Sequence, residues 1–312
     1  MTDRELLFEP LHVGPVTLRN RIVMPPMVVN RGVGTPESCQ WYGARARGGV
    51  GLVIVEATSV SGFTTRHTLE SLSLLAGAIH AGGAMAALQL FPGTRGQRLA
   101  PADLSREDID GLLADYAAAA RLCASAGFDG VEIHGAHGYL LNQFFSPVQN
   151  ARSDAFGGTL AGRMLLGTRI VREVRGALPA ERLLLYRHTP AGPSYGIEES
   201  LQLAETLVDA GVDILDLSPS SLRLPGDAAA PFRSVGVPVI TVNGLDEVAR
   251  ATEALREGRA DLVAIGRGLI ADSDWPNKVR AGQDATLVRC IQCDMCHEDL
   301  AQGRVVRCSQ WS

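Results

Sequence analysis

Two histidines and a tyrosine are grouped in the segment GVEIHGAHGY, residues 130–139. His134 and His137 are three positions apart, and Tyr139 follows directly after a glycine. The run that precedes them is apolar, so we expect a buried strand that ends where these polar side chains begin. In parallel α/β proteins the carboxyl ends of strands carry the reactive groups. The segment therefore predicts the reacting part of a site.

These residue types favour chemistry on a polarised double bond. Two imidazole donors can hold the carbonyl oxygen of an α,β-unsaturated compound while negative charge builds on that oxygen. A tyrosine hydroxyl is protonated at neutral pH and can donate to the α-carbon. The residues alone leave other interpretations open: loop histidines satisfied by backbone carbonyls, a structural tyrosine, or a metal site, although no third ligand lies nearby in the sequence.

A second candidate site is formed by cysteines near the C-terminus. Cys290, Cys293, Cys296 and Cys308 have the spacing C-x2-C-x2-C-x11-C. By spacing alone, a Cys₄ zinc site and a [4Fe–4S] cluster are about equally plausible, and a disulfide pair is the weaker alternative. The other two cysteines are isolated within probable helices.

A third pattern lies just past the last two apolar runs. Asn243–Gly244 follows one run, and Gly266–Arg267 follows the next. Glycines at such positions let backbone N–H groups approach a phosphate, and an arginine can add a charge-assisted contact. Either turn alone could be an ordinary strand-to-helix turn. The two together favour a phosphate site.

Strand-like runs must position these groups, and they alternate with helix-like segments along the chain. The runs are 21–27, 51–57, 84–90, 130–135, 183–189, 214–220, 238–243 and 262–267. Several are apolar almost throughout, as in strands covered on both faces. Eight such units without a linker predict a closed (β/α)₈ TIM barrel. A doubly wound open sheet is the alternative, but no G-x-G-x-x-G follows an early strand.

Three helices are expected with defined ends. Ser105 and Asp108 form a capping box for a helix over 105–125. A second helix over 196–210 has two glutamates near its start, and a third, over 246–257, ends at Gly258.

The totals restrict the class of protein. The 312 residues are 46% hydrophobic with a net charge of −5, which gives no indication of nucleic acid or acidic membrane as a partner. The first residues lack the apolar run of a signal peptide, and no run approaches a membrane span, so we expect a cytoplasmic protein. We expect a barrel over 1–282, a cysteine-rich tail over 283–312, and a homo-oligomer.

The chain resembles the Old Yellow Enzyme family of FMN-dependent ene-reductases. The matching residues between 134 and 158 are His134, His137, Gly138, Tyr139, Gln143, Phe144, Asn150, Arg152, Asp154, Gly157 and Gly158. The resemblance is strongest to the iron–sulfur branch, which contains 2,4-dienoyl-CoA reductase and trimethylamine dehydrogenase and has a similar cysteine spacing after its barrel. It therefore implies a [4Fe–4S] cluster rather than zinc.

The resemblance also implies a set of FMN contacts. Pro26, Met27 and Ala57 match the segments beside the flavin ring. Gln89 and Arg187 match the residues that hydrogen-bond its pyrimidine edge. The positions that bind the FMN phosphate are Asn243, Gly244, Gly266 and Arg267.

Several positions depart from the family pattern. Pro92 stands where a histidine often follows the glutamine of the third strand, and Val28 stands where a threonine or cysteine is common near flavin N5. The loop after the sixth strand lacks the histidine of the dienoyl-CoA reductases, and segments 95–105 and 218–232 are short. The sequence ends four residues after Cys308, whereas the relatives with a cluster continue into FAD- and NAD-binding domains.

The sequence thus predicts an FMN-dependent oxidoreductase that reduces a small-molecule α,β-unsaturated carbonyl compound. Electrons would come from NAD(P)H or from a partner protein through the cluster. The alternatives are a dehydrogenase or demethylase that works in the oxidative direction, and a redox-inactive barrel with structural zinc that acts as a binding subunit.

Overall fold

The computed structural model describes residues 3–93, 99–219 and 226–311. Eight parallel strands close into a barrel, which confirms the predicted fold class. The strands of the barrel are β3 (Ile22–Met24), β4 (Leu52–Ser59), β5 (Met85–Phe91), β6 (Gly130–Gly135), β7 (Leu183–His188), β8 (Ile214–Leu217), β9 (Val239–Val242) and β10 (Leu262–Ala264). They neighbour one another in chain order, and β10 pairs with β3 to close the ring.

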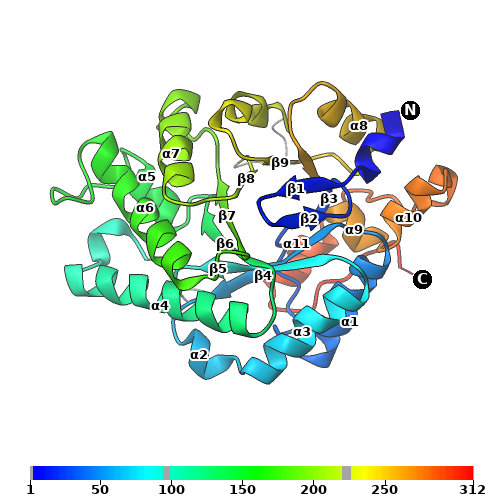
Figure 1. Cartoon of the computed structure of the whole chain (residues 1–312), viewed down its shortest axis with the longest axis horizontal. Helices are drawn as coiled ribbons and strands as arrows, with labels where there is room; N and C mark the ends of the chain where they lie inside the picture. Colours follow the sequence, from blue (N-terminus) through cyan, green and yellow to red (C-terminus); the bar gives the residue numbers. More distant parts are fainter. Residues whose placement is uncertain (1–2, 94–98, 220–225, 312) are drawn as a thin grey trace.

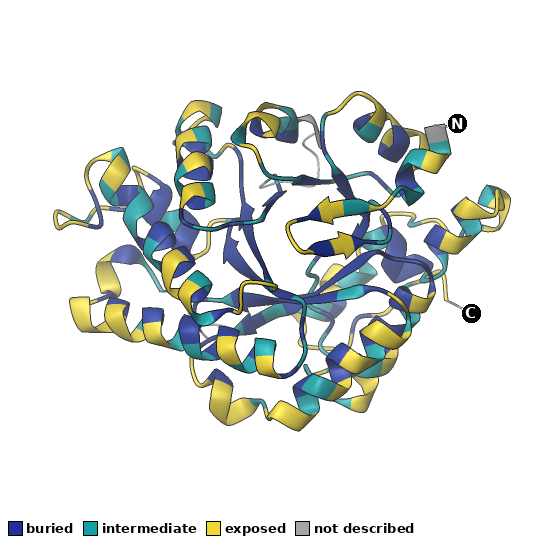
Figure 2. Cartoon of the chain, viewed as in Figure 1, coloured by how far each residue is buried: buried dark blue, intermediate teal, exposed yellow. Residues whose placement is uncertain are grey.

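Helices surround this barrel, with buried inner faces and exposed outer faces (Figure 2). The α-helices are α1 (Pro36–Arg47), α2 (Phe63–Arg66), α3 (Leu69–Ala81), α4 (Arg106–Ser125), α5 (Leu140–Phe145), α6 (Leu160–Ala177), α7 (Ile197–Asp209), α8 (Val248–Arg256), α9 (Arg267–Ala271), α10 (Trp275–Arg280) and α11 (Met295–Ala301). The 3₁₀ helices are η1 (Asp3–Phe8), η2 (Pro101–Asp103), η3 (Gly226–Val235) and η4 (Asp284–Thr286).

The predicted helix ends hold closely. Ser105 caps α4, its hydroxyl accepts from the N–H of Asp108, and the Asp108 carboxylate accepts from the N–H of Ser105. Gly196 and Ala210 flank α7 as predicted. The third helix, α8, begins at Val248 rather than at 246, and Gly258 follows its end with a left-handed backbone.

Two expectations need correction. The first strand ends at Met24 instead of 27, because Pro25 and Pro26 have no N–H to donate to a neighbouring strand. After β8 the described chain forms the 3₁₀ helix η3 rather than an α-helix, and Pro231 within it cannot donate an α-helical hydrogen bond. Residues 95–98 and 220–225 of the two short segments, including the end of the predicted strand 214–220, lie outside the described residues.

The sequence analysis did not predict the hairpin of β1 (Leu11–Val13) and β2 (Val16–Leu18), which lies across one end of the barrel (Figure 1). Val13, Val16 and Leu18 pack against the apolar side chains that fill the barrel interior, such as Leu52 and Leu183. These partners lie at the start of their strands. The hairpin therefore closes the amino-terminal end and leaves the carboxyl-terminal end for a site.

The cysteine-bearing segment packs against that opposite end. The backbone N–H of Val306 donates to Val29 at 3.0 Å, and the indole of Trp311 donates to the carbonyl of Ala271 at 3.2 Å. Asp299 is fully buried and accepts from the side chains of Arg304 and Arg307. The two hydrogen bonds to Val29 and Ala271 hold the tail to the barrel mouth, and the ionic contacts of Asp299 hold the tail together.

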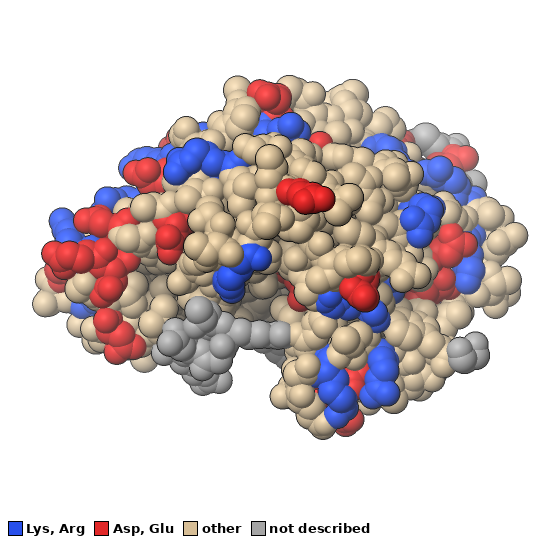
Figure 3. All heavy atoms as spheres, turned by 90° about the horizontal axis from the view of Figure 1, so that it is seen from below, with Lys and Arg blue, Asp and Glu red and all other residues tan. Residues whose placement is uncertain are grey.

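The surface carries charges of both signs. On the face in Figure 3, acidic and basic side chains are interspersed over the part of the chain that the structure describes. None of the described helices is both long and apolar enough to cross a membrane.

Candidate active site

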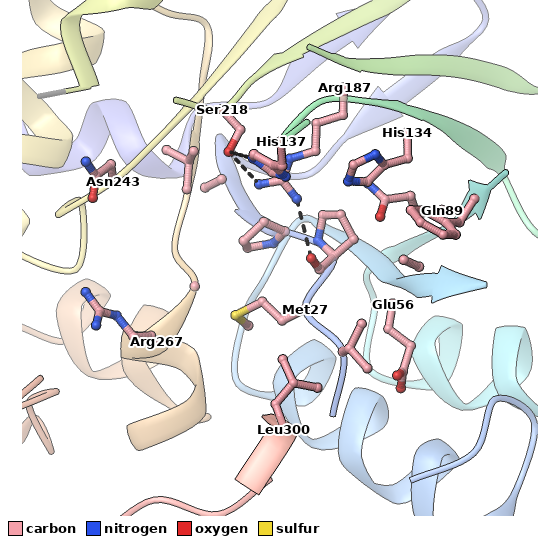
Figure 4. Close-up of a pocket in the computed structure, with 18 of the residues that line it drawn as sticks. Met27, Glu56, Gln89, His134, His137, Arg187, Ser218, Asn243, Arg267 and Leu300 are labelled. Carbon is pink, nitrogen blue, oxygen red and sulfur yellow. Dashed lines mark hydrogen bonds between the residues drawn. The ribbon is translucent and has the colours of Figure 1, made fainter. Parts of the chain in front are cut away.

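A cavity of about 1140 Å³ opens at the carboxyl-terminal end of the barrel (Figure 4). It brings together all the residues that the sequence analysis assigned to cofactor and substrate. The predicted residues that line it are Pro26, Met27, Ala57, Gln89, His134, His137, Tyr139, Arg187, Asn243, Gly244, Gly266 and Arg267. Their convergence from seven different strands and the loops after them is a property of the closed barrel.

One end of the cavity has the features of an anion site. Asn243 and Gly244 both have positive φ, 101° and 68°, so the turn after β9 is tightly bent there. Gly266 ends the turn after β10, and a Cβ at this position would lie 3.2 Å from the sulfur of Met27. Arg267 follows as the first residue of α9. Backbone and guanidinium donors therefore face the same end of the cavity.

Arg250 also lines this end and was not predicted. It belongs to the first turn of α8, and a Cβ added at Gly244 would lie 2.7 Å from its guanidinium. The glycine therefore leaves room for the guanidinium, and its positive φ of 68° also favours a residue without a Cβ. The sequence could not predict this role for Arg250, because an arginine in a helical run is ordinarily a surface residue. Only the geometry of the turn and of α8 shows that it reaches the cavity.

Arg187 is fixed from several sides in the middle of the cavity. Its guanidinium donates to the carbonyl of Pro26 at 3.4 Å and to the hydroxyl of Ser218 at 3.1 Å (Figure 4). Arg187 Nε lies 3.2 Å from Asp216 Oδ2 in a buried ion pair. The neighbouring Gln89 donates to Glu132 at 2.5 Å. Both predicted ring-binding side chains are thus held before any ligand binds.

Glu132, Asp216 and Ser218 are further site residues that sequence reasoning missed. The two acids are completely buried, each within an otherwise apolar strand, β6 and β8. A charged residue inside a buried run is unusual unless it is paired. An acid within each of the buried strands GVEIHG and ILDL was therefore a sign in the sequence of a paired polar site. The sequence alone did not show which residues were the partners.

His134 and His137 lie at the other end of the cavity with their ring centroids 5.4 Å apart. Burial lowers the pKa of His134 well below its usual value and that of His137 to about 3, and the nearby charge of Arg187 adds to both shifts. Both imidazoles are therefore neutral at physiological pH. His137 Nε2 is hydrogen-bonded to Ser218 Oγ at 2.8 Å.

Tyr139 stands beside this pair at the mouth of the cavity. Its ring meets those of His134 and Phe91 edge to face, with centroids 5.3 and 5.0 Å away. About 48% of the residue is exposed. The ring is thus next to His134 and the residue is accessible to solvent, which is suitable for a group that must be reprotonated.

The departures from the family pattern have defined positions. Val28 lines the cavity, so an apolar side chain takes the place of a hydrogen-bonding one. Pro92 is buried, and it is the preceding Phe91 that reaches the cavity. The aromatic wall of Phe91 therefore occupies this side of the substrate end.

All four predicted cysteines line a second, smaller cavity of about 20 Å³. Cys290, Cys293, Cys296 and Cys308 are free thiols. Among the described residues, no group of three or more His, Cys, Asp or Glu side chains is gathered closely enough to be picked out as a site for a metal ion. Cys293 Sγ is instead 3.0 Å from Ser309 Oγ. Arg267 and Cys290 line both cavities, so the two adjoin.

The large cavity fits the shape and chemistry of FMN. Arg250, Arg267 and the bent turn at Asn243–Gly244 offer donors for a phosphate. Gln89 and Arg187 offer polar contacts for a heterocycle edge, and Met27 gives an apolar surface beside them. The volume slightly exceeds the usual range for small-molecule sites, about 300–1,000 Å³, and so leaves room for a second ligand.

The closed barrel has candidate phosphate donors at one side of its carboxyl-terminal mouth and candidate ring-binding groups at its centre. This arrangement is typical of barrel enzymes that bind a phosphorylated cofactor. The family of NADH:flavin oxidoreductases and NADH oxidases matches residues 6–101 and 94–285, so this chain belongs to it. Membership confirms the predicted class, an FMN oxidoreductase of the Old Yellow Enzyme type. The match ends before the first cysteine of the tail.

Similar proteins include both longer and comparable chains. An NADH oxidase of Thermoanaerobacter brockii is 34% identical over 95% of this chain, which covers 54% of that protein. The 6-hydroxypseudooxynicotine amine oxidase of Pseudomonas geniculata N1 is 25% identical, with a TM-score of 0.88 over 99% of this chain and 54% of its own. The old yellow enzyme homologue of Zymomonas mobilis is 27% identical, with a TM-score of 0.80 over 91% of this chain and 94% of its own. The chain spans about half the length of the first curated relatives it matches.

Proposed function

We propose that this protein uses FMN and NAD(P)H to reduce the activated C=C bond of a small α,β-unsaturated carbonyl compound. One observation carries the proposal: phosphate donors, ring-binding groups and the His134–His137–Tyr139 group converge on a single cavity. Bound FMN would supply hydride to the β-carbon of the substrate. The remaining steps are the work of the protein side chains.

The two histidines would orient the substrate by its carbonyl oxygen. Each neutral imidazole has one N–H donor, and negative charge grows on the oxygen as the β-carbon is reduced. Because the low pKa values keep both rings neutral, they stabilise this charge by hydrogen bonding without losing a proton. Ser218 and Thr189 support the arrangement, because they bind the ring and the backbone N–H of His137.

Tyr139 would complete the reaction by transferring the proton of its hydroxyl to the α-carbon. Its position beside His134 supports this role, and its exposure would let water restore the proton. The apolar side chains of Phe91 and Val28 limit the space around the double bond.

We further propose that residues 283–312 form a tail that holds a [4Fe–4S] cluster on the four cysteines. Support comes from the shared cavity of the four thiols and from its contact with the flavin cavity through Arg267 and Cys290. The cluster would pass electrons to or from the flavin, and a partner protein could dock near it. Zinc in the same site is the alternative, with NAD(P)H as the direct reductant.

An absorption spectrum of anaerobically purified protein, before and after dithionite, tests these cofactors. Flavin bands above a broad shoulder, both bleached on reduction, are expected, together with iron and sulfide in the protein. Flavin bands with zinc and no iron would overturn the cluster and leave the reductase. A colourless protein would overturn the proposed function and favour a binding subunit.

A second candidate is the oxidative direction, in which an amine or alcohol is oxidised and electrons leave through the cluster. The likeness to an amine oxidase over 99% of this chain favours it. Product analysis with NAD(P)H plus an enone, against an amine plus an artificial acceptor, separates the two. Reduction of the enone without amine turnover is the expected result. A predicted homo-oligomer can be tested on the same sample by its mass in solution.

A further inference from the structure

Four polar side chains form one layer directly above the apolar interior of the barrel. They come from four neighbouring strands and have exposed fractions of 6% or less: Gln89 of β5, Glu132 of β6, Arg187 of β7 and Asp216 of β8. Ala87, Leu185 and Ile214 precede three of these residues by two positions and belong to the apolar cluster inside the barrel. Because side chains two apart on a strand share a face, the polar layer also points inward. The family resemblance assigned Gln89 and Arg187, but nothing so far explains the two acids.

Strand register pairs these side chains. Gln89 is directly opposite Glu132, and Arg187 is directly opposite Asp216. Gln89 Nε2 donates to Glu132 Oε2 at 2.5 Å. The Arg187–Asp216 ion pair, at 3.2 Å, is without good hydrogen-bond alignment. Each acid therefore contacts one residue of the cofactor cavity.

The carboxyl oxygens of Glu132 and Asp216 have fewer hydrogen-bond donors around them than two ionised acids need, which indicates that one of the acids is protonated. If both acids were ionised, Glu132 Oε1 and both oxygens of Asp216 would lack a hydrogen-bond donor within the described part of the chain. The two carboxyl groups are nevertheless within hydrogen-bonding reach of each other. Two carboxylates cannot bond to each other, whereas one carboxylic acid donates to one carboxylate. A single proton satisfies the pair.

We propose that Glu132 carries this proton and donates it to the carboxylate of Asp216. The acid–carboxylate pair is a positioning element: Glu132 holds Gln89, and Asp216 holds Arg187 and offsets its charge. The layer then contains one cation and one anion, instead of a net negative charge among buried side chains.

Burial supports the assignment of the proton. It raises the pKa of Glu132 well above its usual value, and the neighbouring Asp216 raises it further. Burial raises the pKa of Asp216 as well, and Arg187 offsets part of that effect. Because Arg187 Nε lies 3.2 Å from Asp216 Oδ2, Asp216 is the better place for the charge. A glutamine at 132 can make both contacts of a protonated glutamate, with its oxygen toward Gln89 and its amide toward Asp216.

Because glutamine can replace a protonated glutamate but not a charged one, the proposal can be tested by substitution. The flavin readout of this experiment rests on the proposed function. The equilibrium between bound FMN and a reference redox dye is measured for Glu132→Gln, Asp216→Asn and the control Asp213→Asn. Asp213 is on the opposite end of the β8 region, paired with Arg175 at 3.0 Å. Asp216→Asn should favour reduced flavin about tenfold, because Arg187 loses its counter-charge beside the cofactor. Glu132→Gln and Asp213→Asn should change the equilibrium less than threefold, a small effect on the same scale. A shift in Glu132→Gln as large as that in Asp216→Asn would overturn the proposal, because it would mean that Glu132 is charged.

A second measurement needs no flavin, and its decisive outcome is read from the wild-type protein. Infrared spectra of the protein at pH 8 should contain the C=O band of a protonated carboxylic acid, and this band should shift in D₂O. The band should vanish in Glu132→Gln and persist in Asp213→Asn. Its absence from the wild-type protein would overturn the shared proton whether or not FMN binds. A protein that shows the band but binds no FMN would refute the proposed function alone.

Discussion

The two adjoining cavities are built in opposite ways. The flavin cavity is surrounded by the ends of a closed sheet, and its polar groups are held by buried partners, as Arg187 is by Asp216 and Ser218. The cysteine cavity is formed by the loop before α11, the first turn of α11 and residues after that helix, against Arg267 and Ile270 of α9. In that loop, Gln292 and Asp294 have positive φ without being glycines, and Cys293 is exposed.

This difference suggests what each cavity needs from its cofactor. A barrel folds around its own apolar layers, so the flavin groups are arranged without FMN. Three of the four thiols lie outside helices and have few contacts that fix them, so a bound metal would supply much of their order. Loss of the cluster should therefore change the tail far more than loss of FMN changes the barrel.

The most direct test of this difference comes from removing a thiol. Cys293→Ala takes away one of four ligands without altering the flavin cavity, which this residue does not line. We expect iron per chain to fall at least tenfold, as for losses around metal ligands generally, with FMN content unchanged. Metal analysis and the absorption spectrum measure both quantities.

Cys39→Ser is the matched control, since Cys39 is a half-buried cysteine of α1. Its iron content should equal that of the wild-type protein. Loss of FMN together with iron in Cys293→Ala would contradict the independence of the two cavities.

The next effect tests the boundary between them. Arg267 lines both cavities and lies 3.5 Å from Asp294 in the cysteine loop. Arg267→Ala should weaken FMN binding roughly 10- to 100-fold, the value of a charge-assisted hydrogen bond of about 1.5–3 kcal/mol. Titration of the apoprotein followed by flavin fluorescence measures this affinity.

Two further variants give the arginine its controls. Arg121→Ala, on the exposed face of α4, should leave FMN affinity unchanged. Asp294→Asn removes the ion pair while keeping the arginine, so FMN should bind as tightly or more tightly. Weaker binding in Asp294→Asn would mean that the cysteine loop helps to build the flavin cavity.

Tyr139→Phe tests whether the flavin cavity separates cofactor binding from proton transfer. Turnover of an enone should fall about 100-fold, the low end of the range for loss of a general acid. Reduction of the enzyme by NAD(P)H serves as an internal control and should be unaffected. Stopped-flow measurement of the two half-reactions distinguishes them, and an unchanged rate of enone reduction would remove Tyr139 from the mechanism.

The contrast between the cavities also explains what the sequence could and could not predict. Eight apolar runs predicted the barrel, and the polar residues and glycines at strand ends predicted His134, His137, Tyr139 and the two turns after the last strands, because these patterns are local. The other five predicted residues of the cavity came from the family resemblance, namely Pro26, Met27, Ala57, Gln89 and Arg187. Glu132 and Asp216 were missed, because their pairing depends on the register of adjacent strands. The three-residue strands of the hairpin are too short for a periodic pattern, and the docking of Trp311 on α9 has no local pattern at all.

The smallest expected effect concerns the stability of the barrel that holds the flavin cavity in place. His188 of β7 is buried, its Nε2 lies 3.0 Å from Ser200 Oγ, and burial lowers its pKa to about 4. In the unfolded chain the His188 imidazole is protonated near pH 6.5, whereas in the folded chain it is protonated only near pH 4. The contribution of His188 to the free energy of unfolding is therefore fully present above pH 6.5 and falls toward pH 4, by up to about 1.4 kcal/mol per pH unit.

Denaturant unfolding at pH 7 and pH 5 should show a smaller loss of stability in His188→Gln than in the wild-type protein. The same substitution at His12, which is exposed on the hairpin, should leave the loss unchanged. An equal loss in His188→Gln and the wild-type protein would show that His188 does not carry this acid sensitivity.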